Sequence, residues 1–234
     1  MPDQPDRPDV VLAWDTTKDS NVGAWQQKRR LASAMRLVME RLVPSNAPED
    51  ELRRAAEGLE RYAEALTEHP RLKNIHGYPE SATSGDVGAF FDQSPFIGLA
   101  NPLAPPITVG KAGKWKAVAK ARFGSAYEGA PGCVHGGFVA GAFDEVLGYV
   151  NALSGQGGMT GRLTIHFRSP TPLHTELFFE AEILRIEGRK IFTEGKLYAG
   201  DRLCAEAEGL FISVGMEKFQ ELLRQREAQE QDRN

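Results

Sequence analysis

The sequence predicts an α+β fold in which an antiparallel sheet wraps around one long central helix. Two observations predict it: residues 132–153 have the pattern of a helix with a broad apolar face, and the segments after it alternate as strands joined by short turns. An open sheet must cover its apolar face, and a helix of this length is available to lie across it. An N-terminal helical extension precedes this domain.

The predicted central helix, residues 132–153, contains no Lys or Arg. At 100° per residue one face is apolar and is expected in the core: Phe138, Val139, Ala142, Phe143, Val146, Tyr149 and Val150. The opposite face is made of small or polar residues: Gly137, Ala140, Gly141, Asp144, Gly148 and Asn151. A solvated face normally carries long charged side chains, so this strip indicates a surface that something approaches closely, with Asp144 on it.

The remaining elements follow from periodicity and turn residues. Strands are predicted over residues 117–123, 163–167, 177–186, 191–198 and 203–214, with hairpin turns at Gly188 and Gly200. Helical spacing predicts two helices, over 22–43 and 48–66, which together form a hairpin. Prolines and glycines interrupt every period between residues 69 and 90, where irregular chain is expected.

These elements predict four regions along the chain. Residues 1–20, rich in Pro and Asp, are expected to be flexible. Residues 21–89 form the helical extension, a hairpin plus a linker, and residues 90–216 form the domain of sheet and central helix. Residues 217–234 are expected to be a polar C-terminal helix or tail.

The composition argues against several function classes. A net charge of -4, without any long block of Lys or Arg, disfavours a nucleic-acid-binding protein and an anionic-membrane surface. No apolar stretch reaches the roughly 18 residues that span a bilayer, so no transmembrane segment is expected. The acidic, proline-rich start is unlike a secretion signal. His, Cys and acidic residues do not cluster at ligand spacing, so no metal is expected.

The two cysteines, Cys133 and Cys204, are too few for a disulfide framework and match no zinc-finger spacing. We expect them to be packing residues of a soluble protein in the reducing cytoplasm.

The start of the central helix has the residues of an acyl-transfer site. Backbone N–H groups near His135-Gly136-Gly137 lie at the positive end of the helix, and the two glycines let a ligand oxygen reach them. Asp144 lies on the side that contains Gly137, where a carboxylate could attack an acyl carbon or take a proton from water. The donor-rich helix start, the face of small residues and the acid each have an ordinary structural explanation when taken alone. Their occurrence together on one helix favours a site for acyl transfer. Glu145 is the competing acid and ranks second.

The region from Gly129 to Leu173 contains the string Pro131 to Gly137, Asp144 nine positions after the histidine, the strand 163–167 and Pro170-Thr171-Pro172-Leu173. In these residues the region resembles hotdog-fold acyl-CoA thioesterases. The resemblance covers about residues 90–215 and is greatest for the phenylacetate-pathway type and related thioesterase superfamily members. It implies a hotdog fold and hydrolysis of an acyl-CoA thioester to free acid and coenzyme A, in fatty acid metabolism. No cofactor is implied, because coenzyme A is part of the substrate.

The resemblance also implies roles for individual residues. Asp144 would be the nucleophile or general base, the Gly136 N–H would polarise the thioester carbonyl, and His135 would help to hold the thioester. Thr160 matches a hydroxyl residue that comes from the neighbouring subunit, so the site would need a homodimer or a dimer of dimers. Residues that would line the substrate groove or meet coenzyme A phosphates are Gly137, Gly141, Arg162, Arg168, Arg189 and Lys190.

Two alternatives stay open at this point. The same fold could bind an acyl-CoA or an acyl carrier without catalysis. The helical extension would then signal to a partner protein whether the groove holds a ligand. Hydration of an enoyl-CoA is disfavoured, because the Asp and His string of that enzyme group is absent. The helical extension could cap an acyl tunnel, lengthen a dimer interface or bind a partner, and the sequence does not choose among these roles or fix the acyl chain.

Overall fold

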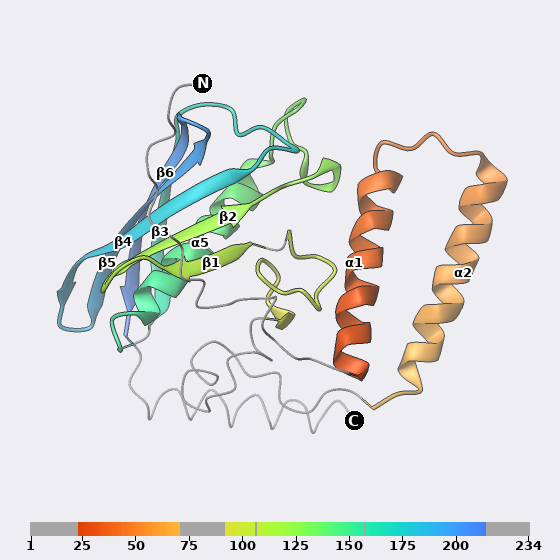
Figure 1. Cartoon of the computed structure of the whole chain (residues 1–234), viewed down its shortest axis with the longest axis horizontal. Coiled ribbons are helices and arrows are strands. Elements are labelled where there is room, and N and C mark those ends of the chain that lie inside the picture. The colour runs from red at the N-terminus through yellow and green to blue at the C-terminus, as the bar shows by residue number, and fades with distance from the viewer. Residues whose placement is uncertain (1–22, 71–91, 106, 157, 214–234) are drawn as a thin grey trace. The chain divides into compact units, whose positions relative to one another are not determined.

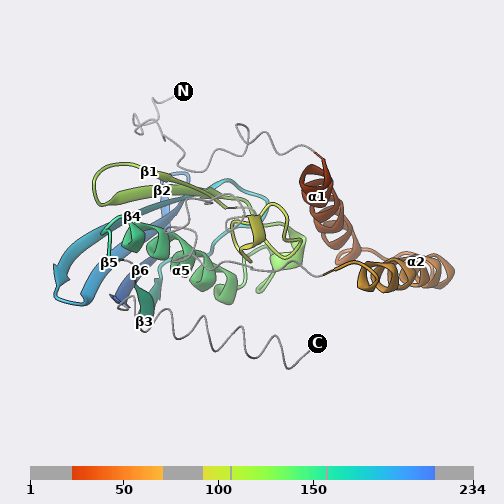
Figure 2. The ribbon, with the colours of Figure 1, turned by 90° about the horizontal axis from the view of Figure 1, so that it is seen from below.

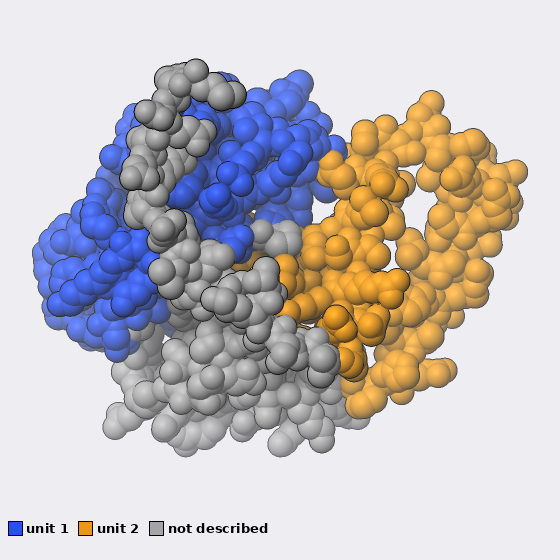
Figure 3. Space-filling view, viewed as in Figure 1, with its two compact units in different colours: residues 1–19, 105–234 blue, residues 20–104 orange. Residues whose placement is uncertain are grey.

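The structure is a computed structural model that describes residues 23–70, 92–105, 107–156 and 158–213. The chain divides into two compact units, residues 20–104 and residues 105–234 with 1–19, coloured orange and blue in Figure 3. Each unit is described by itself. The expectations for residues 1–20, for most of the irregular stretch before residue 92 and for residues 217–234 lie outside the described residues.

The larger unit contains a six-stranded antiparallel sheet in the order β1-β2-β4-β5-β6-β3. The helix α5 (Gly136–Ala152) contacts all six strands, and Figures 1 and 2 show the sheet curved around it, with β1 and β3 at opposite edges. This arrangement confirms the predicted α+β hotdog fold. The strands are β1 (Thr108–Lys111), β2 (Lys116–Ala121), β3 (Met159–Phe167), β4 (Leu177–Glu187), β5 (Lys190–Ala199) and β6 (Arg202–Ile212).

Several boundaries differ from prediction by one or two residues, and the larger differences are as follows. The helix α5 begins at Gly136 and not at residue 132, because Gly132 adopts φ 72 and residues 133 and 134 form isolated bridges with other segments. The strand β3 begins at Met159, before the predicted residue 163, because its first residues pair with β6 despite their weak strand pattern. The short strand β1 was not predicted, and the 3-10 turn η1 (Ser125–Tyr127) follows β2.

The predicted apolar face of α5 packs on the sheet. Phe143 contacts Phe179 of β4 edge to face, with ring centroids 5.3 Å apart. Leu147 lies over Gly195 and Gly209, where an added Cβ would come within 3.2 Å of its methyl groups. These glycines let the helix approach the sheet closely. Among the predicted core residues of this face, Phe138 is half-buried. The others are buried: Val139, Ala142, Phe143, Val146, Tyr149 and Val150.

The opposite face of α5, which the sequence predicted to be a contact surface, is partly exposed in the single chain. Gly137 and Asp144 are exposed, and Gly148 is half-buried. Asn151 was predicted on this face and is instead buried, with 2% of its surface exposed. Its amide Nδ2 donates to the carbonyl of Gly158, just before β3, so the chain that leaves the helix covers it.

The smaller unit contains the two predicted helices, α1 (Ala24–Leu42) and α2 (Glu49–Thr67), joined by residues 43–48. A buried carboxylate, Asp92, accepts hydrogen bonds from Trp25 and from Arg29, whose Nε lies 2.6 Å from its Oδ2. Arg36 donates to the carbonyl of Asn101 at 2.8 Å. The segment 92–104 is therefore fastened to α1, a pairing across more than sixty residues that no local pattern indicates.

The helix α2 has an amphipathic sequence and no buried residue. One of its faces carries exposed apolar side chains: Leu52, Leu59, Tyr62 and Leu66.

The close approach of α5 to the sheet gives a stability prediction. Gly209→Ala places a Cβ about 2.4 Å from Thr193 Oγ1 and 2.9 Å from the Phe211 ring, so the core must shift. We expect the free energy of unfolding to fall by about 1–3 kcal/mol, measured by chemical denaturation. The added substitution Thr193→Ala removes one of the two clashes and should recover part of the loss. An unchanged midpoint in the single variant would contradict the packing described here.

Candidate active site

The segment before α5 is held in place by contacts from three directions. The His135 N–H donates to the carbonyl of Tyr127 at 2.9 Å, and the Val134 N–H donates to that of Thr171 at 2.8 Å. Gly129 packs against His135 so closely that an added Cβ would lie 2.7 Å from the His135 Cα. The first turn of α5 therefore has a fixed position in the unit.

His135 is the N-cap residue of α5. Its Nδ1 accepts a hydrogen bond from the Gly137 N–H at 3.0 Å, which requires an unprotonated Nδ1 and uses one of the open donors of the first turn. The Gly136 N–H has no acceptor among the described residues. The cap therefore leaves Gly136 as an open donor at the positive end of the helix.

Phe167 lies beside this donor. An added Cβ on Gly136 would come within 3.2 Å of the Phe167 Cζ, and the Phe167 side chain is 58% exposed at the end of β3. The ring provides an apolar surface beside the Gly136 Cα, at the residue that carries the open donor. The sequence did not indicate this contact, because it depends on the direction in which β3 runs along α5.

Asp144 of α5 forms a hydrogen bond with Thr160, at the start of β3. Thr160 Oγ1 donates to Asp144 Oδ1 at 2.7 Å, and both side chains are exposed. The resemblance implied a hydroxyl from a neighbouring subunit, whereas here the hydroxyl and the carboxylate belong to one chain. The cause is the connection 153–158, which turns the chain back so that the start of β3 passes the middle of α5.

The strand β3 thus runs past α5 with Thr160 at Asp144 and Phe167 at Gly136. Gly136 and Asp144 are eight residues apart on the helix, which is about 12 Å along its axis. The expected donor and the expected acid of one chain therefore occupy two separate positions along the helix.

The expected substrate-binding residues differ in their surroundings. Gly141 is half-buried on the small-residue face of α5, and Arg162 is exposed on β3 and forms no ion pair within the described part of the chain. Arg168 is bound to Glu206, with Nε 2.7 Å from the carboxylate. Arg189 donates to the carbonyl of Ser213 at 3.0 Å. Arg162 is therefore the readiest of these to meet a ligand phosphate.

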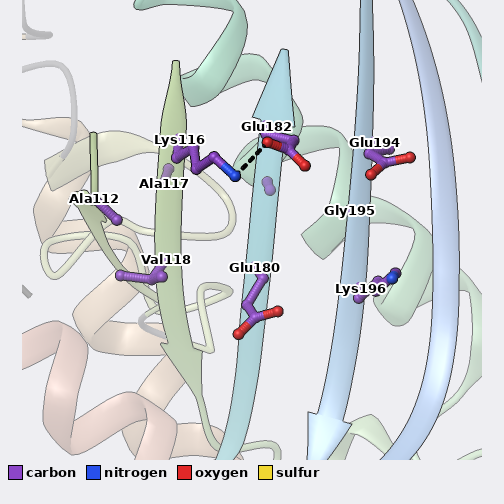
Figure 4. A pocket seen from close by; sticks show the side chains of 10 residues that line it. Ala112, Lys116, Ala117, Val118, Glu180, Glu182, Glu194, Gly195 and Lys196 are labelled. Carbon is purple, nitrogen blue, oxygen red and sulfur yellow. Dashed lines mark ion pairs between the residues drawn. The ribbon is translucent and has the colours of Figure 1, made fainter. Parts of the chain in front are cut away.

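A pocket of about 260 Å³ lies on strands β2, β4 and β5, away from the predicted site residues (Figure 4). Lys116 Nζ lies 2.6 Å from Glu182 Oε2, and this carboxylate raises the pKa of Lys116, with smaller contributions from Glu180 and Glu194. These charged side chains form a solvated surface of the sheet, so the pocket is not the candidate active site.

Two further findings bear on the class of site. Within residues 23–70, 92–105, 107–156 and 158–213, no three His, Cys, Asp or Glu side chains are grouped as metal ligands. None of the described helices combines the length and apolar character that crossing a membrane requires.

Comparison with known proteins identifies the family. The sequence profile of the thioesterase superfamily matches residues 131–206, from the loop before α5 into β6. The solved structure of protein RHA08564, described as a thioesterase superfamily protein, is 31% identical, with a TM-score of 0.71, and the match covers 83% of this chain and 92% of that chain. This chain belongs to the thioesterase superfamily. The match to that structure covers much more of this chain than the residues 131–206 that the family profile matches.

Curated relatives match over a shorter region. Acyl-coenzyme A thioesterase THEM4 of Xenopus laevis is 36% identical over 89 residues, which is 37% of this superfamily member and 40% of the relative. THEM4 of Bos taurus is 37% identical over 93 residues, covering 39% and 38%. THEM5 of Homo sapiens is 30% identical over 97 residues, covering 41% and 39%. The chain thus spans about two-fifths of the length of these relatives.

The capping role of His135 gives a prediction about stability. His135→Ala removes the acceptor for the Gly137 N–H and should lower the free energy of unfolding by about 0.5–2 kcal/mol. His135→Asn replaces the Nδ1 acceptor with a side-chain oxygen at the N-cap and should retain most of the parent stability. Urea denaturation of the three proteins measures the difference. Equal losses in both variants would show that the histidine stabilises the unit in another way.

Proposed function

We propose that this protein hydrolyses an acyl-CoA thioester to the free acid and coenzyme A. The observation that supports the proposal most is the presence on one helix of an open N–H, that of Gly136, and of an acid, Asp144, whose Oδ1 is held by Thr160. The family and the names of the relatives THEM4 and THEM5 point to the same chemistry. Because the match spans two-fifths of those relatives, the activity rests on the site as well as on the likeness.

The reaction needs three operations that these groups can perform. Asp144 either attacks the thioester carbon or takes a proton from the water that attacks it. The Gly136 N–H donates to the carbonyl oxygen as negative charge develops there. The C–S bond then breaks, and the thiolate of coenzyme A leaves. If Asp144 took a proton from the attacking water, it returns that proton to the thiolate. If Asp144 attacked the carbon, water hydrolyses the resulting anhydride to the free acid and the Asp144 carboxylate and supplies the proton of the thiol. Thr160 fixes one carboxylate oxygen of Asp144 and so directs the other toward the substrate.

We propose that each site combines two subunits. An oxygen that attacks a carbonyl directly and a donor to that carbonyl must lie within about 6–7 Å of one another, whereas Gly136 and Asp144 of one chain are about 12 Å apart along α5. The two positions lie at equal distances from Ala140. If two α5 helices crossed antiparallel at Ala140, a two-fold axis would bring Gly136 of one chain opposite Asp144 of the other.

The surfaces of the unit support this pairing of subunits. Ala140 and Gly141 on α5 have no side chain that would keep a second helix away. The strand β3 ends the sheet, and most of its residues are exposed, including Met159 and Phe167, each 58% exposed. A nine-residue strand whose outer edge pairs with no other described strand is a template for a second copy of itself. A homodimer with adjacent β3 strands would cover it, and two such dimers could associate further.

The finer assignments follow from the same site. Arg162, exposed on β3, is the residue that we propose for a phosphate of coenzyme A, and Arg168 would have to leave Glu206 to assist it. The histidine-glycine-glycine string keeps the phenylacetate-pathway type as the proposed branch. Cys133 and Cys204 are both free thiols, which fits the cytoplasm as the proposed location.

The role of Asp144 is tested by Asp144→Asn, which keeps the shape of the side chain and an oxygen for Thr160. We expect kcat to fall by about 10²–10⁴ with KM little changed, because the amide is neither a base nor a nucleophile. Release of the coenzyme A thiol, followed with a thiol reagent over short, long, branched and aryl acyl-CoAs, measures it. Asp201→Asn, in the β5–β6 turn, is the matched control and should hydrolyse at the parent rate.

The outcomes separate the two functions considered. Hydrolysis by the Asp144→Asn protein at the parent rate would remove Asp144 from the mechanism. A parent protein that binds acyl-CoAs and releases no thiol would identify a binding protein.

The role of the Gly136 N–H is tested by Gly136→Pro. Proline fits the first position of a helix, and His135 already has the extended ψ of 132° that a following proline requires. The variant deletes the N–H and should lower kcat by about 10²–10³. Gly136→Ala introduces the same Cβ beside Phe167 but keeps the donor, so it should lose much less. Equal losses in the two variants would exclude the donor role.

The same variants test the shared site. A dimer that contains one Asp144→Asn chain and one Gly136→Pro chain has one intact site if the site spans two subunits. Random mixing should then restore about a quarter of the parent activity. Sites within single chains would give no recovery.

A further inference from the structure

Asn151 is a buried polar residue to which the proposed mechanism assigns no role. It lies in the last turn of α5 with 2% of its surface exposed, and its Nδ2 donates to the Gly158 carbonyl at 3.1 Å. Its Oδ1 is buried and has no partner among the described residues. A buried acceptor without a partner destabilises a fold, so the amide is poorly explained as a device for stability alone.

The residue that Asn151 holds is also fixed from the other side. An added Cβ on Gly158 would lie 3.0 Å from the backbone of Ile212 at the end of β6. Ser213 Oγ donates to the carbonyl of Gln156 at 3.4 Å. The start of β3 is therefore clamped between the end of the helix and the end of the neighbouring strand.

Thr160 follows two residues after this clamp. The register between β3 and β6 shifts between Thr160 and Arg162, at Gly161. A bulge of this kind redirects the side chains around it, and here the Thr160 hydroxyl reaches Asp144 at 2.7 Å. The segment from Gly158 to Thr160 is thus attached to α5 at two points seven residues apart, Asn151 and Asp144, which lie on the same side of the helix.

We propose that Asn151 is a positioning residue that sets Thr160 against the acid, an inference that rests on the proposed thioester hydrolysis. By holding the Gly158 carbonyl, Asn151 fixes the place at which β3 begins. This determines whether the Thr160 hydroxyl meets Asp144 Oδ1 and leaves the second oxygen for the thioester. Asn151 itself touches no reacting atom.

A double-mutant cycle tests the inference. Asn151→Leu keeps the volume of the side chain and removes the donor, and Thr160→Ala removes the hydroxyl. We expect Asn151→Leu to lower kcat about tenfold with KM within twofold, because a displacement of about 1 Å in a catalytic group costs up to 10²-fold. The double variant should be no slower than Thr160→Ala alone. Multiplicative effects of the two substitutions would overturn the proposal.

A matched control separates positioning from stability. Thr193 is also 2% exposed, and its Oγ1 donates to the Gly209 carbonyl at 3.3 Å, at the position of β6 that pairs with Leu163 and not with Thr160. Thr193→Val removes this buried hydrogen bond and should shift Tm by at least as much as Asn151→Leu while kcat stays within twofold of the parent. A tenfold loss of kcat in both proteins would show that the loss follows from lower stability of the fold in general, and it would overturn the inference.

A crystal structure of the Asn151→Leu protein decides the matter independently of activity. Loss of the hydrogen bond between Thr160 Oγ1 and Asp144 Oδ1, with the fold retained, supports the inference, and an unchanged contact overturns it. A parent protein that hydrolyses no acyl-CoA overturns the proposed hydrolysis alone, since this structural measurement still shows whether Asn151 positions Thr160.

Discussion

The packing of α5 onto the curved sheet is the constraint on which the rest of the larger unit depends. Leu147 lies over Gly195 and Gly209, and Phe143 packs against Phe179, so the helix lies close to the strands. This burial fixes the rotation of α5 about its own axis. Once one face is committed to the core, the side with Gly137 and Asp144 must face outward. The placement of the acid is therefore a consequence of hydrophobic packing.

The first turn of α5 and the strand β3 add what the helix alone lacks. His135 occupies the Gly137 N–H and leaves that of Gly136 open, while the return of the chain along the helix brings Thr160 to the carboxylate. The open donor and the acid then lie at opposite ends of a strip of small residues, Gly137, Ala140 and Gly141, of which only Gly137 is fully exposed. In our proposal, the distance between them makes a second subunit a chemical requirement and not only a means of covering an edge strand.

The sequence predicted the features that depend on local periodicity. The apolar stripe of α5, the hairpins at Gly188 and Gly200 and the two helices before residue 70 were all predicted, and both glycines have the positive φ that such turns need. Features set by contacts between distant segments were not predictable. Asn151 was expected outside because its helical angle places it beside Asp144, and only the path of the following chain buries it. The partners of Thr160 and Phe167 depend on that same path.

Two of the contacts within the smaller unit, from Arg29 to Asp92 and from Arg36 to the Asn101 carbonyl, join the ends of a long stretch of the chain that includes α2. The entropy lost on closing a loop grows only with the logarithm of its length, and each doubling adds about 0.6 kcal/mol. Insertions or deletions in this stretch, outside α1 and α2, would therefore leave the closing contacts almost as favourable as before. The anchor of α1 thus tolerates changes in the length of the chain that it closes.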